Sequence, residues 1–260
     1  MKTLLFIVDM QNDFCSPGGS LYVPGAEKDA ERLGRLIDRK GEEIDKIILT
    51  LDQHHVMDIA HPAYWQNAKG EHPAPFTTIS WWDVLSGAWI PFGDKTYVVE
   101  YLRQLKETGE YQHMIWSEHC LKGSEGAAII PELFEAVVRW ARGGRYYETM
   151  EKGLHPGTEF FGAFRANVPV TSAPETTFNM KLKEEMEQYD TIWLAGEART
   201  HCVANTLKQL FDFPEIIRRM VILEDCMSNI PGCDELAVPI YGTAARLGAR
   251  FVKSDALLLE

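Results

Sequence analysis

The sequence predicts an α/β fold in which helices cover both faces of a parallel β-sheet. Short apolar runs bounded by turn residues recur along the chain, and segments with helical apolar spacing lie between them. This alternation is typical of right-handed β–α–β units. The chain has 260 residues, 45% of them hydrophobic, which is enough for a sizeable core. Because it contains neither an internal repeat nor a low-complexity linker, we expect one domain over residues 1–260.

The first half of the chain opens on a continuous apolar run, which a loop rich in Gly and Pro separates from an amphipathic segment. Such a run is typical of a strand buried on both faces. The elements expected here are strands at Leu4–Val8, Lys46–Leu51 and Gln112–Trp116 and helices at Ala26–Lys40 and Pro131–Ala141.

The second half repeats the pattern with shorter connections. The expected elements are strands at Tyr146–Met150, Thr191–Ala195 and Met220–Leu223, helices at Val203–Phe211 and Asp234–Leu247, and a short apolar end at Ala249–Val252. Six strands are thus expected in all.

The exception to this alternation is an insertion at about 63–111, which is long, irregular and rich in aromatic residues. Within it, Thr96–Thr108 has helical character. A long irregular segment in a compact domain is usually functional or part of an interface. Its aromatic side chains either pack on one another or wall a substrate pocket or a subunit contact. Both interpretations remain open, and the segment is our first candidate for a homo-oligomer interface.

Composition excludes several classes of partner. The formal net charge is −12 and no run of Lys or Arg interrupts the acidity, so we expect neither nucleic acid nor a membrane surface as a partner. No apolar stretch approaches the length of a membrane span. The five cysteines are an odd number without a close-set framework, which favours a reduced, cytoplasmic setting.

The most informative stretch surrounds Cys202, where the strand that ends near Ala195 gives way to a helix after Gly196. A cysteine in the first turn of a helix faces unpaired backbone N–H groups and the positive end of the helix dipole, which lower the pKa of a thiol. The same N–H groups are suited to hold an oxyanion. The alternative is a buried, inert cysteine.

Polar residues follow five successive expected strands, and parallel strands bind ligands at their carboxyl ends. Asp9, Lys152 and Cys202 form one set. A cysteine thiolate is a strong nucleophile, an aspartate whose pKa is raised by burial is a plausible general base, and a lysine is a counter-ion for both. The alternative for Asp9 and Lys152 is a structural ion pair.

The second set has the composition of a metal site. Asp52 and His54 lie on one side of an extended segment, and His119 follows the next expected strand. Two imidazoles and a carboxylate suit one divalent metal ion with open positions, zinc first and iron or manganese as alternatives. His61 is a candidate extra ligand. The alternative is that each histidine is an ordinary hydrogen-bonding residue.

In this order and spacing, the motifs resemble those of the isochorismatase-like cysteine hydrolases, and among them the nicotinamidase-related branch. The match runs over most of the chain. The segments that carry it are Val8–Cys15, Gly18–Leu21, Asp52–His54, Trp116–Cys120, Gly123–Ala127, Pro131–Leu133, Lys152–Gly153 and Gly196–Val203.

The resemblance implies a three-layer α/β/α, Rossmann-like fold around a six-stranded parallel sheet. It also implies that Asp9, Lys152 and Cys202 are catalytic. A cis peptide before Ala198 would turn the Ala198 N–H into an oxyanion hole beside that of Cys202.

The resemblance further implies how a substrate is held. The aromatic rings of Phe14 and Trp116 would enclose a pyridine ring whose nitrogen faces the metal. The implied metal ligands are Asp52, His54 and His119, with His61 in place of a histidine that some members use.

Two features depart from the pattern of nicotinamidases. Those enzymes usually read Gly-Val-Ala-Thr-Asp where this chain has Gly196-Glu197-Ala198-Arg199-Thr200, so we expect Glu197 and Arg199 to reshape or charge the rim of the pocket. The aromatic insertion also lengthens the spacing from His54 to His119. Both departures leave the thiolate chemistry intact and bear on the substrate.

The leading hypothesis is therefore a metal-dependent cysteine amidohydrolase that converts nicotinamide to nicotinate and ammonia through a thioester. One alternative is a related cysteine hydrolase acting on another small amide, ureido or N-carbamoyl substrate. Another is a non-catalytic binding protein on the same fold. Metal-free vinyl ether hydrolysis of the isochorismate type is disfavoured, because that chemistry requires neither a cysteine nor an Asp-x-His ligand set.

Overall fold

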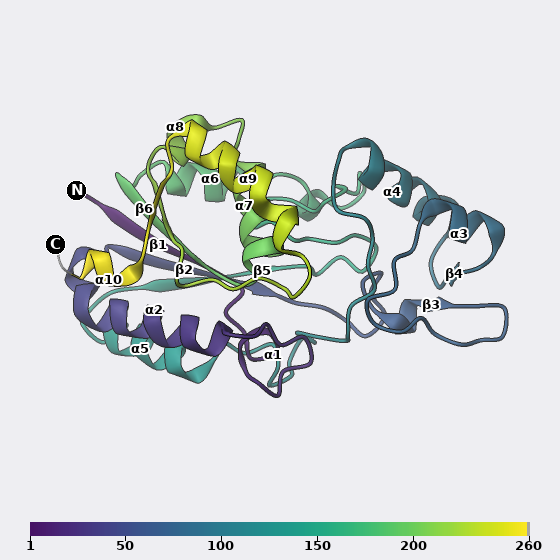
Figure 1. Cartoon of the computed structure of the whole chain (residues 1–260), viewed down its shortest axis with the longest axis horizontal. Coiled ribbons are helices and arrows are strands. Elements are labelled where there is room, and N and C mark those ends of the chain that lie inside the picture. Colours follow the sequence, from purple (N-terminus) through teal and green to yellow (C-terminus); the bar gives the residue numbers. More distant parts are fainter. Residues whose placement is uncertain (259–260) are drawn as a thin grey trace.

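The computed structural model describes residues 1–258 and centres on a six-stranded sheet with helices on both faces (Figure 1). Every neighbouring pair of strands in this sheet is parallel. In spatial order the strands are β5 (Tyr147–Lys152), β2 (Lys46–Asp52), β1 (Thr3–Val8), β6 (Thr191–Gly196), β7 (Met220–Leu223) and β8 (Arg250–Val252). The predicted three-layer α/β/α class is confirmed.

The helices form one layer on each side of the sheet (Figure 1). The layer drawn below the sheet contains α2 (Ala26–Lys40), α5 (Pro131–Ala141) and α10 (Ser254–Leu257), with the one-turn α1 (Asn12–Cys15) and η1 (Gly41–Glu43) at the two ends of α2. The layer above contains α6 (Met180–Met186), α7 (Ala204–Gln209), α8 (Pro214–Ile217) and α9 (Asp234–Leu247), and η3 (Pro174–Thr176) precedes α6.

The core has two halves because successive residues of a strand point to opposite faces of the sheet. In β1, Leu5 and Ile7 pack with α2 and α5, whereas Leu4, Phe6 and Val8 pack with α7 and α9. All five side chains are fully buried. This explains why the central strands read as continuous apolar runs in the sequence.

The order of the strands places a topological switch at β1. The chain passes from β1 outward through β2 to β5, and then returns to β6 on the other side of β1. In an open parallel sheet the ligand crevice lies beyond the carboxyl ends of the strands at this switch. The residues that follow β1 and β6 are Asp9 and the loop that leads to Cys202.

The insertion lies beyond one end of the sheet (Figure 1). It contains η2 (Pro62–Tyr64), α3 (Trp81–Ser86), α4 (Lys95–Glu107) and an antiparallel pair of short strands, β3 (Trp65–Gln66) and β4 (Ile90–Pro91). A third apolar cluster, which includes Trp65, Val98 and Tyr101, holds it together. Most of the buried aromatics of the insertion therefore pack on one another, whereas Phe92 and Trp82 are 78% and 62% exposed.

The prediction of a sheet strand at Gln112–Trp116 is wrong. The backbone of this segment pairs with the insertion instead, since Ile115 N–H donates to Thr77 O (2.8 Å) and Ile79 N–H donates to His113 O (3.0 Å). The sixth strand is β8, within the apolar end that the sequence left unassigned. An apolar run cannot reveal whether its partner is the main sheet or an inserted segment.

A buried histidine in the segment that pairs with the insertion is expected to make stability depend on pH. His113 is 3% exposed, its Nε2–H donates to Ile59 O (3.0 Å), and burial lowers its pKa to about 4. The unfolded chain binds a proton near pH 6.5, so stability is lost as the pH falls from 6.5 to 4, by up to about 3 kcal/mol. We expect His113→Gln to reduce this slope in urea-unfolding experiments across that window. An unchanged slope in the variant would contradict the assignment.

Within residues 1–258, no helix combines the length and the apolar character that a membrane span requires. The single-domain organisation over residues 1–260 with an insertion at about 63–111, the cytoplasmic location and the homo-oligomer stay predictions, as does the absence of nucleic-acid and membrane partners.

Candidate active site

Cys202 lies at the start of a helix, as its sequence context predicts. After β6, the loop at Gly196–Ala198 leads into a π-helical turn, η4 (Arg199–Val203), which continues directly as α7. Gly196 has φ +128° and its Cα faces the backbone of Val8, so close that a Cβ atom would lie 2.0 Å from Val8 O. Glycine is therefore required here for β6 to turn beside β1.

Asp9, Lys152 and Cys202 come together beyond the carboxyl ends of β1, β5 and β6. Lys152 Nζ lies 2.9 Å from Asp9 Oδ2 and 3.8 Å from Cys202 Sγ, and all three side chains are buried. Asp9 has φ +46°, and its other oxygen accepts from Thr50 Oγ1 at 2.5 Å. The residues of the predicted catalytic set thus lie together in a buried site.

Burial dominates the ionisation of this set. It raises the pKa of Asp9, against the lowering effect of Lys152. It raises the pKa of the Cys202 thiol well above its usual value, and the charge of Lys152 offsets this only in part. Lys152 thus lowers the pKa of this thiol, as predicted, but burial raises it by more. The effect of the start of the helix stays a prediction.

Lys152 remains charged. Burial acts to lower its pKa, but Asp52 and Asp9 hold the pKa well above its usual value. Its Nζ lies 3.0 Å from Asp52 Oδ1 and donates to Phe160 O (2.8 Å). Lys152 is therefore an ammonium ion between two carboxyl groups, and its Nζ also contacts Cys202 Sγ.

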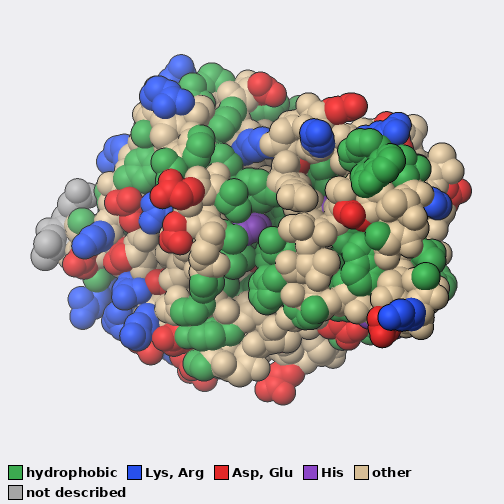
Figure 2. Space-filling view, turned by 45° about the vertical axis from the view of Figure 1, so that its right-hand side comes forward, with side chains coloured by type: hydrophobic (Ala, Val, Ile, Leu, Met, Phe, Trp, Pro, Cys, Tyr) green, Lys and Arg blue, Asp and Glu red, His purple; other side chains and the backbone are tan. Residues whose placement is uncertain are grey.

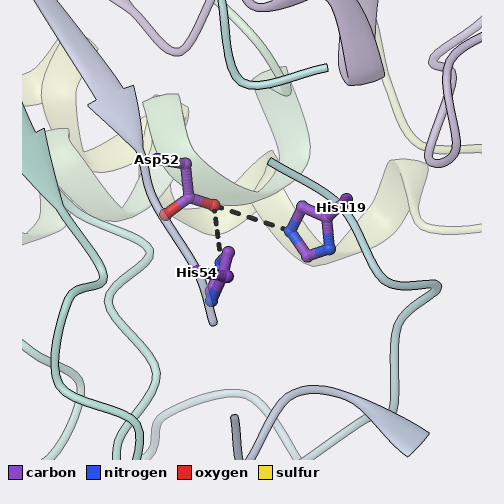
Figure 3. Close-up of side chains that lie close together, drawn as sticks. All are labelled: Asp52, His54 and His119. Carbon is purple, nitrogen blue, oxygen red and sulfur yellow. Dashed lines mark hydrogen bonds and ion pairs between the residues drawn. The ribbon is translucent and has the colours of Figure 1, made fainter. Parts of the chain in front are cut away.

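Asp52 joins this set to a second one. Its Oδ2 lies 3.1 Å from His54 Nε2 and 3.6 Å from His119 Nε2 (Figure 3). One donor atom from each of the three residues lies within 4.8 Å of the other two, and all three residues are buried. His119 does not follow a strand of the sheet. It is held near His54 by an isolated parallel β-bridge between His54 and Leu121.

The three residues fit a divalent metal ion. The Nδ1 of His54 faces Asp58 Oδ2 (3.1 Å), and the Nδ1 of His119 faces Ser117 O (2.8 Å). An oxygen on Nδ1 fixes the tautomer that leaves Nε2 free as a ligand. Although burial acts the other way, Lys152 and His54 hold the pKa of Asp52 well below its usual range, so this residue offers an anionic oxygen.

His61 lies beside this group but is not one of the three residues whose donor atoms converge. Its Nε2 faces His119 Nδ1 at 3.3 Å, on the side of that ring away from Asp52, and its Nδ1 faces His55 O. Burial lowers the pKa of His61 to about 2, so its ring is neutral. A ligand role for His61 stays a prediction.

A pocket with aromatic walls opens onto both sets of residues. Phe14, Trp116 and Phe161 line it together with Cys202 and His119. Figure 2 shows a histidine side chain at the bottom of a narrow hollow between hydrophobic side chains. The two aromatic residues expected to enclose a substrate ring therefore lie beside the thiol and the candidate metal ligands. A mostly aromatic lining with a few polar groups is typical of small-molecule sites.

Ala198 and Cys202 also line this pocket. The peptide bond between Glu197 and Ala198 is cis, as the resemblance implied. Neither Glu197 nor Arg199 is among the pocket-lining residues. Glu197 is fully buried, and the Arg199 guanidinium lies over the Tyr241 ring, 4.9 Å from its centre. The expectation that these two side chains charge the rim of the pocket is therefore wrong, because both turn away from it.

Two ionisable pocket residues were missed by the sequence reasoning, as was the aromatic wall residue Phe161. The Glu159 carboxyl group accepts from Trp116 Nε1 (3.1 Å), and burial raises its pKa to about 8. His201 stands edge-on to Trp116, and burial lowers its pKa to about 4, so its ring is neutral. The signal for His201 was its position beside Cys202, whereas Glu159 belongs to an irregular segment without a pattern.

Sequence comparison finds relatives of one kind. The chain is 25% identical over 206 residues to the nicotinamidase of Saccharomyces cerevisiae, covering 79% of each chain. It is 25% identical over 203 residues to the nicotinamidase of Escherichia coli, covering 78% of this chain and 73% of that one. No protein-family model matches the chain.

Solved structures share the fold. A yeast nicotinamidase bound to the inhibitor nicotinaldehyde has a TM-score of 0.67 at 20% identity, covering 96% of this chain and 99% of its own. An Acinetobacter nicotinamidase/pyrazinamidase has a TM-score of 0.65 at 22% identity, covering 98% of each chain. A pyrazinamidase of Pyrococcus horikoshii, solved in complex with zinc, has a TM-score of 0.58 at 18% identity, covering 97% and 99%.

The fold is the one that solved nicotinamidases and pyrazinamidases share. The sequence relatives confirm the resemblance to the nicotinamidase-related branch of the isochorismatase-like hydrolases. The chain is accordingly similar to nicotinamidases both in sequence and in fold.

Proposed function

We propose that this protein is a metal-dependent cysteine amidohydrolase that converts nicotinamide to nicotinate and ammonia. The observation that carries the proposal is the position of Asp52, which contacts Lys152 through one oxygen and two histidine nitrogens through the other. Through this carboxylate, the thiol set and the candidate metal ligands form one buried unit beside a pocket with aromatic walls.

In the proposed reaction, Asp9 accepts the proton of the Cys202 thiol as the sulfur attacks the amide carbon. The raised pKa of Asp9 makes it a better base for a thiol whose own pKa is raised. Lys152, 3.8 Å from the sulfur, stabilises the thiolate as it forms. The oxyanion of the tetrahedral intermediate would accept hydrogen bonds from the N–H groups of Ala198 and Cys202.

The second half of the reaction uses the same residues in reverse. Asp9 returns its proton to the nitrogen, the C–N bond breaks, and ammonia leaves a thioester on Cys202. Asp9 then takes a proton from a water molecule as the water attacks the thioester. Nicotinate leaves, and the proton passes back to the sulfur.

The residues that would hold the metal are Asp52, His54 and His119. A divalent cation bound there would supply a Lewis-acidic anchor for a ring nitrogen of the substrate. Zinc is the ion that two imidazoles and one carboxylate favour, and iron or manganese are alternatives. Phe14 and Trp116 would enclose the ring and hold its carboxamide beside Cys202.

The test is ammonia release from nicotinamide by the purified protein, before and after chelation and after restoration of zinc, iron or manganese. We expect release that is lost on chelation and regained with one of these metals. Loss should be at least about 10²-fold, the effect of removing a substrate-orienting group.

Asp58→Asn offers a matched check on the metal site, because Asp58 contacts His54 without being a ligand. We expect its metal affinity to fall about 10- to 100-fold, measured by competition with a chromogenic chelator. If a folded, metal-loaded sample releases no ammonia from nicotinamide, the substrate is another small amide. Release that persists unchanged in the fully chelated protein would contradict metal dependence.

A further inference from the structure

Glu197 is a buried carboxyl group that the proposed reaction does not use. It directly precedes Ala198, and it is 0% exposed. Its backbone N–H donates to Val8 O (2.8 Å), so its place at the end of β6 is fixed beside Asp9. Burying a carboxyl group without a cation is costly, and such a residue needs a partner.

That partner is Asp29 of α2. Burial is the largest influence on the pKa of each of these acids, and a hydrogen bond between the two raises the pKa of Glu197 and lowers that of Asp29. Ser228 touches both groups, because its N–H donates to Glu197 Oε2 (3.2 Å) and its Oγ–H donates to Asp29 Oδ2 (2.5 Å). Helix α2 approaches this point closely, since a Cβ on Gly25 would lie 3.0 Å from Ser228 Oγ.

The hydrogen-bond count requires a proton between the two acids. Glu197 Oε1 is buried and finds no donor among residues 1–258 as long as both groups are ionised. A proton on Glu197 would satisfy it by donation to Asp29. Arg32 Nη1 donates to Asp29 Oδ1 (2.7 Å), so Asp29 is the member that keeps its charge.

The other ionisable groups around the pair favour this arrangement. A second negative charge on the pair would be repelled by Glu27 of α2 and by Asp225 after β7. The pKa of the nearby Cys15 thiol of α1 is itself raised, first by burial and then by the two acids of the pair. Tyr241 of α9 faces the pair as a neutral phenol. Arg32 is the cation that binds Asp29, whereas Arg199 lies over the Tyr241 ring and near Glu224.

The carboxyl pair lies next to the backbone of the loop at Gly196–Ala198, which carries part of the proposed oxyanion site. Arg199 N–H donates to Ser228 O (2.8 Å), and Gly196 N–H donates to Cys226 O (3.0 Å). The segment at Ser228 is therefore tied both to the loop backbone and to the two acids. A shift of Ser228 would therefore act on the backbone next to Ala198, which lines the pocket.

We propose that Glu197 and Asp29 share one proton, and that this hydrogen bond positions the loop of Ala198 and Cys202 for catalysis. The inference rests on the proposed function, and it assigns to both acids a positioning role. Loss of the shared proton at alkaline pH places two adjacent carboxylates in a dry site, and their repulsion displaces the loop. Misplacement of a catalytic group by about 1 Å costs about 10²-fold in rate.

The first experiment is independent of turnover. The infrared spectrum of the wild type at neutral pH should contain the carbonyl stretch of a protonated carboxyl group that disappears in Glu197→Gln. Glu42→Gln, which changes a side chain that is 92% exposed, is the matched control and should leave this band intact. A difference spectrum without the band would overturn the proposal, even if the protein is inactive on nicotinamide.

The second experiment measures kcat and KM for nicotinamide against pH. Gln at position 197 can donate to Asp29 at every pH, so Glu197→Gln should keep kcat at high pH, where the wild type loses about tenfold or more. Glu197→Leu should have the low kcat at all pH values, with KM changed by less than about threefold. Identical pH profiles of the wild type and Glu197→Gln would overturn the positioning role. The comparison of the wild type with Glu197→Gln tests the positioning role even if Glu197→Leu does not fold.

Discussion

Replacement of Cys202 by alanine is expected to abolish turnover while the protein stays folded. The side chain is 6% exposed and lies 3.8 Å from Lys152 Nζ, and no other thiol lines the pocket formed by the described residues. Without the sulfur no thioester forms, and kcat for ammonia release should fall by at least about 10⁴-fold, as it does when a nucleophile is removed from other hydrolases.

The matched control is Cys233→Ala, which removes a half-buried thiol outside the pocket. It should keep kcat within about threefold of the wild type, the range expected for residues that do not touch the reaction. Thermal melts of both variants report whether the fold survives. A Cys202→Ala variant that turns over at a rate near that of the wild type would rule out nucleophilic catalysis by this residue.

Replacement of Lys152 by methionine is expected to have the largest effect on stability. It leaves the carboxylates of Asp9 and Asp52, which lie 2.9 and 3.0 Å from Lys152 Nζ, buried without their shared cation. Breaking a buried ion pair from one side costs about 3–5 kcal/mol of unfolding free energy, to be measured in urea. The rate of amide hydrolysis should also fall by about 10²-fold or more, since the thiolate loses its counter-ion.

The control for charge removal is Lys122→Met. Lys122 pairs with Glu151 at 2.7 Å, but both side chains are more than 40% exposed, so its loss should cost at most about 1 kcal/mol. If Lys152→Met does not fold, the added change Asp9→Asn should recover part of the stability, because it removes one of the two uncompensated charges. Equal losses in Lys152→Met and Lys122→Met would show that the buried ion pairs contribute nothing.

The regular part of the fold could be predicted from the sequence. The helices at Ala26–Lys40, Pro131–Ala141 and Asp234–Leu247 and the strand at Met220–Leu223 have the predicted bounds. In each of these elements a regular hydrophobic pattern lies between turn residues. The type of the element and its first and last residues can therefore be predicted from the local sequence. The irregular segment at Gln112–Trp116 ends in three apolar residues, and its partner in the insertion is not a local property.

The candidate site could be predicted as a set of residues and not as an electrostatic unit. The carboxyl ends of parallel strands meet at one edge of the sheet, which is why Asp9, Lys152 and Cys202 could be grouped before any geometry was known. Their protonation states could not be predicted in this way, because burial raises the pKa of the Cys202 thiol more than the charge of Lys152 lowers it. Desolvation depends on every atom packed around a group, and no spacing in the sequence encodes it.

The sequence by itself therefore determined the α/β class, the chemistry of the residues at the strand ends and their likeness to one family of hydrolases. Only the tertiary structure decided that Asp52 connects the lysine to the two histidines, that Arg199 turns away from the pocket, and that Glu197 faces Asp29. The first group of properties follows from local periodicity and residue type. The second depends on contacts between segments far apart in the chain. Asp29 and Glu197, for example, are 168 positions apart, and packing alone brings them together.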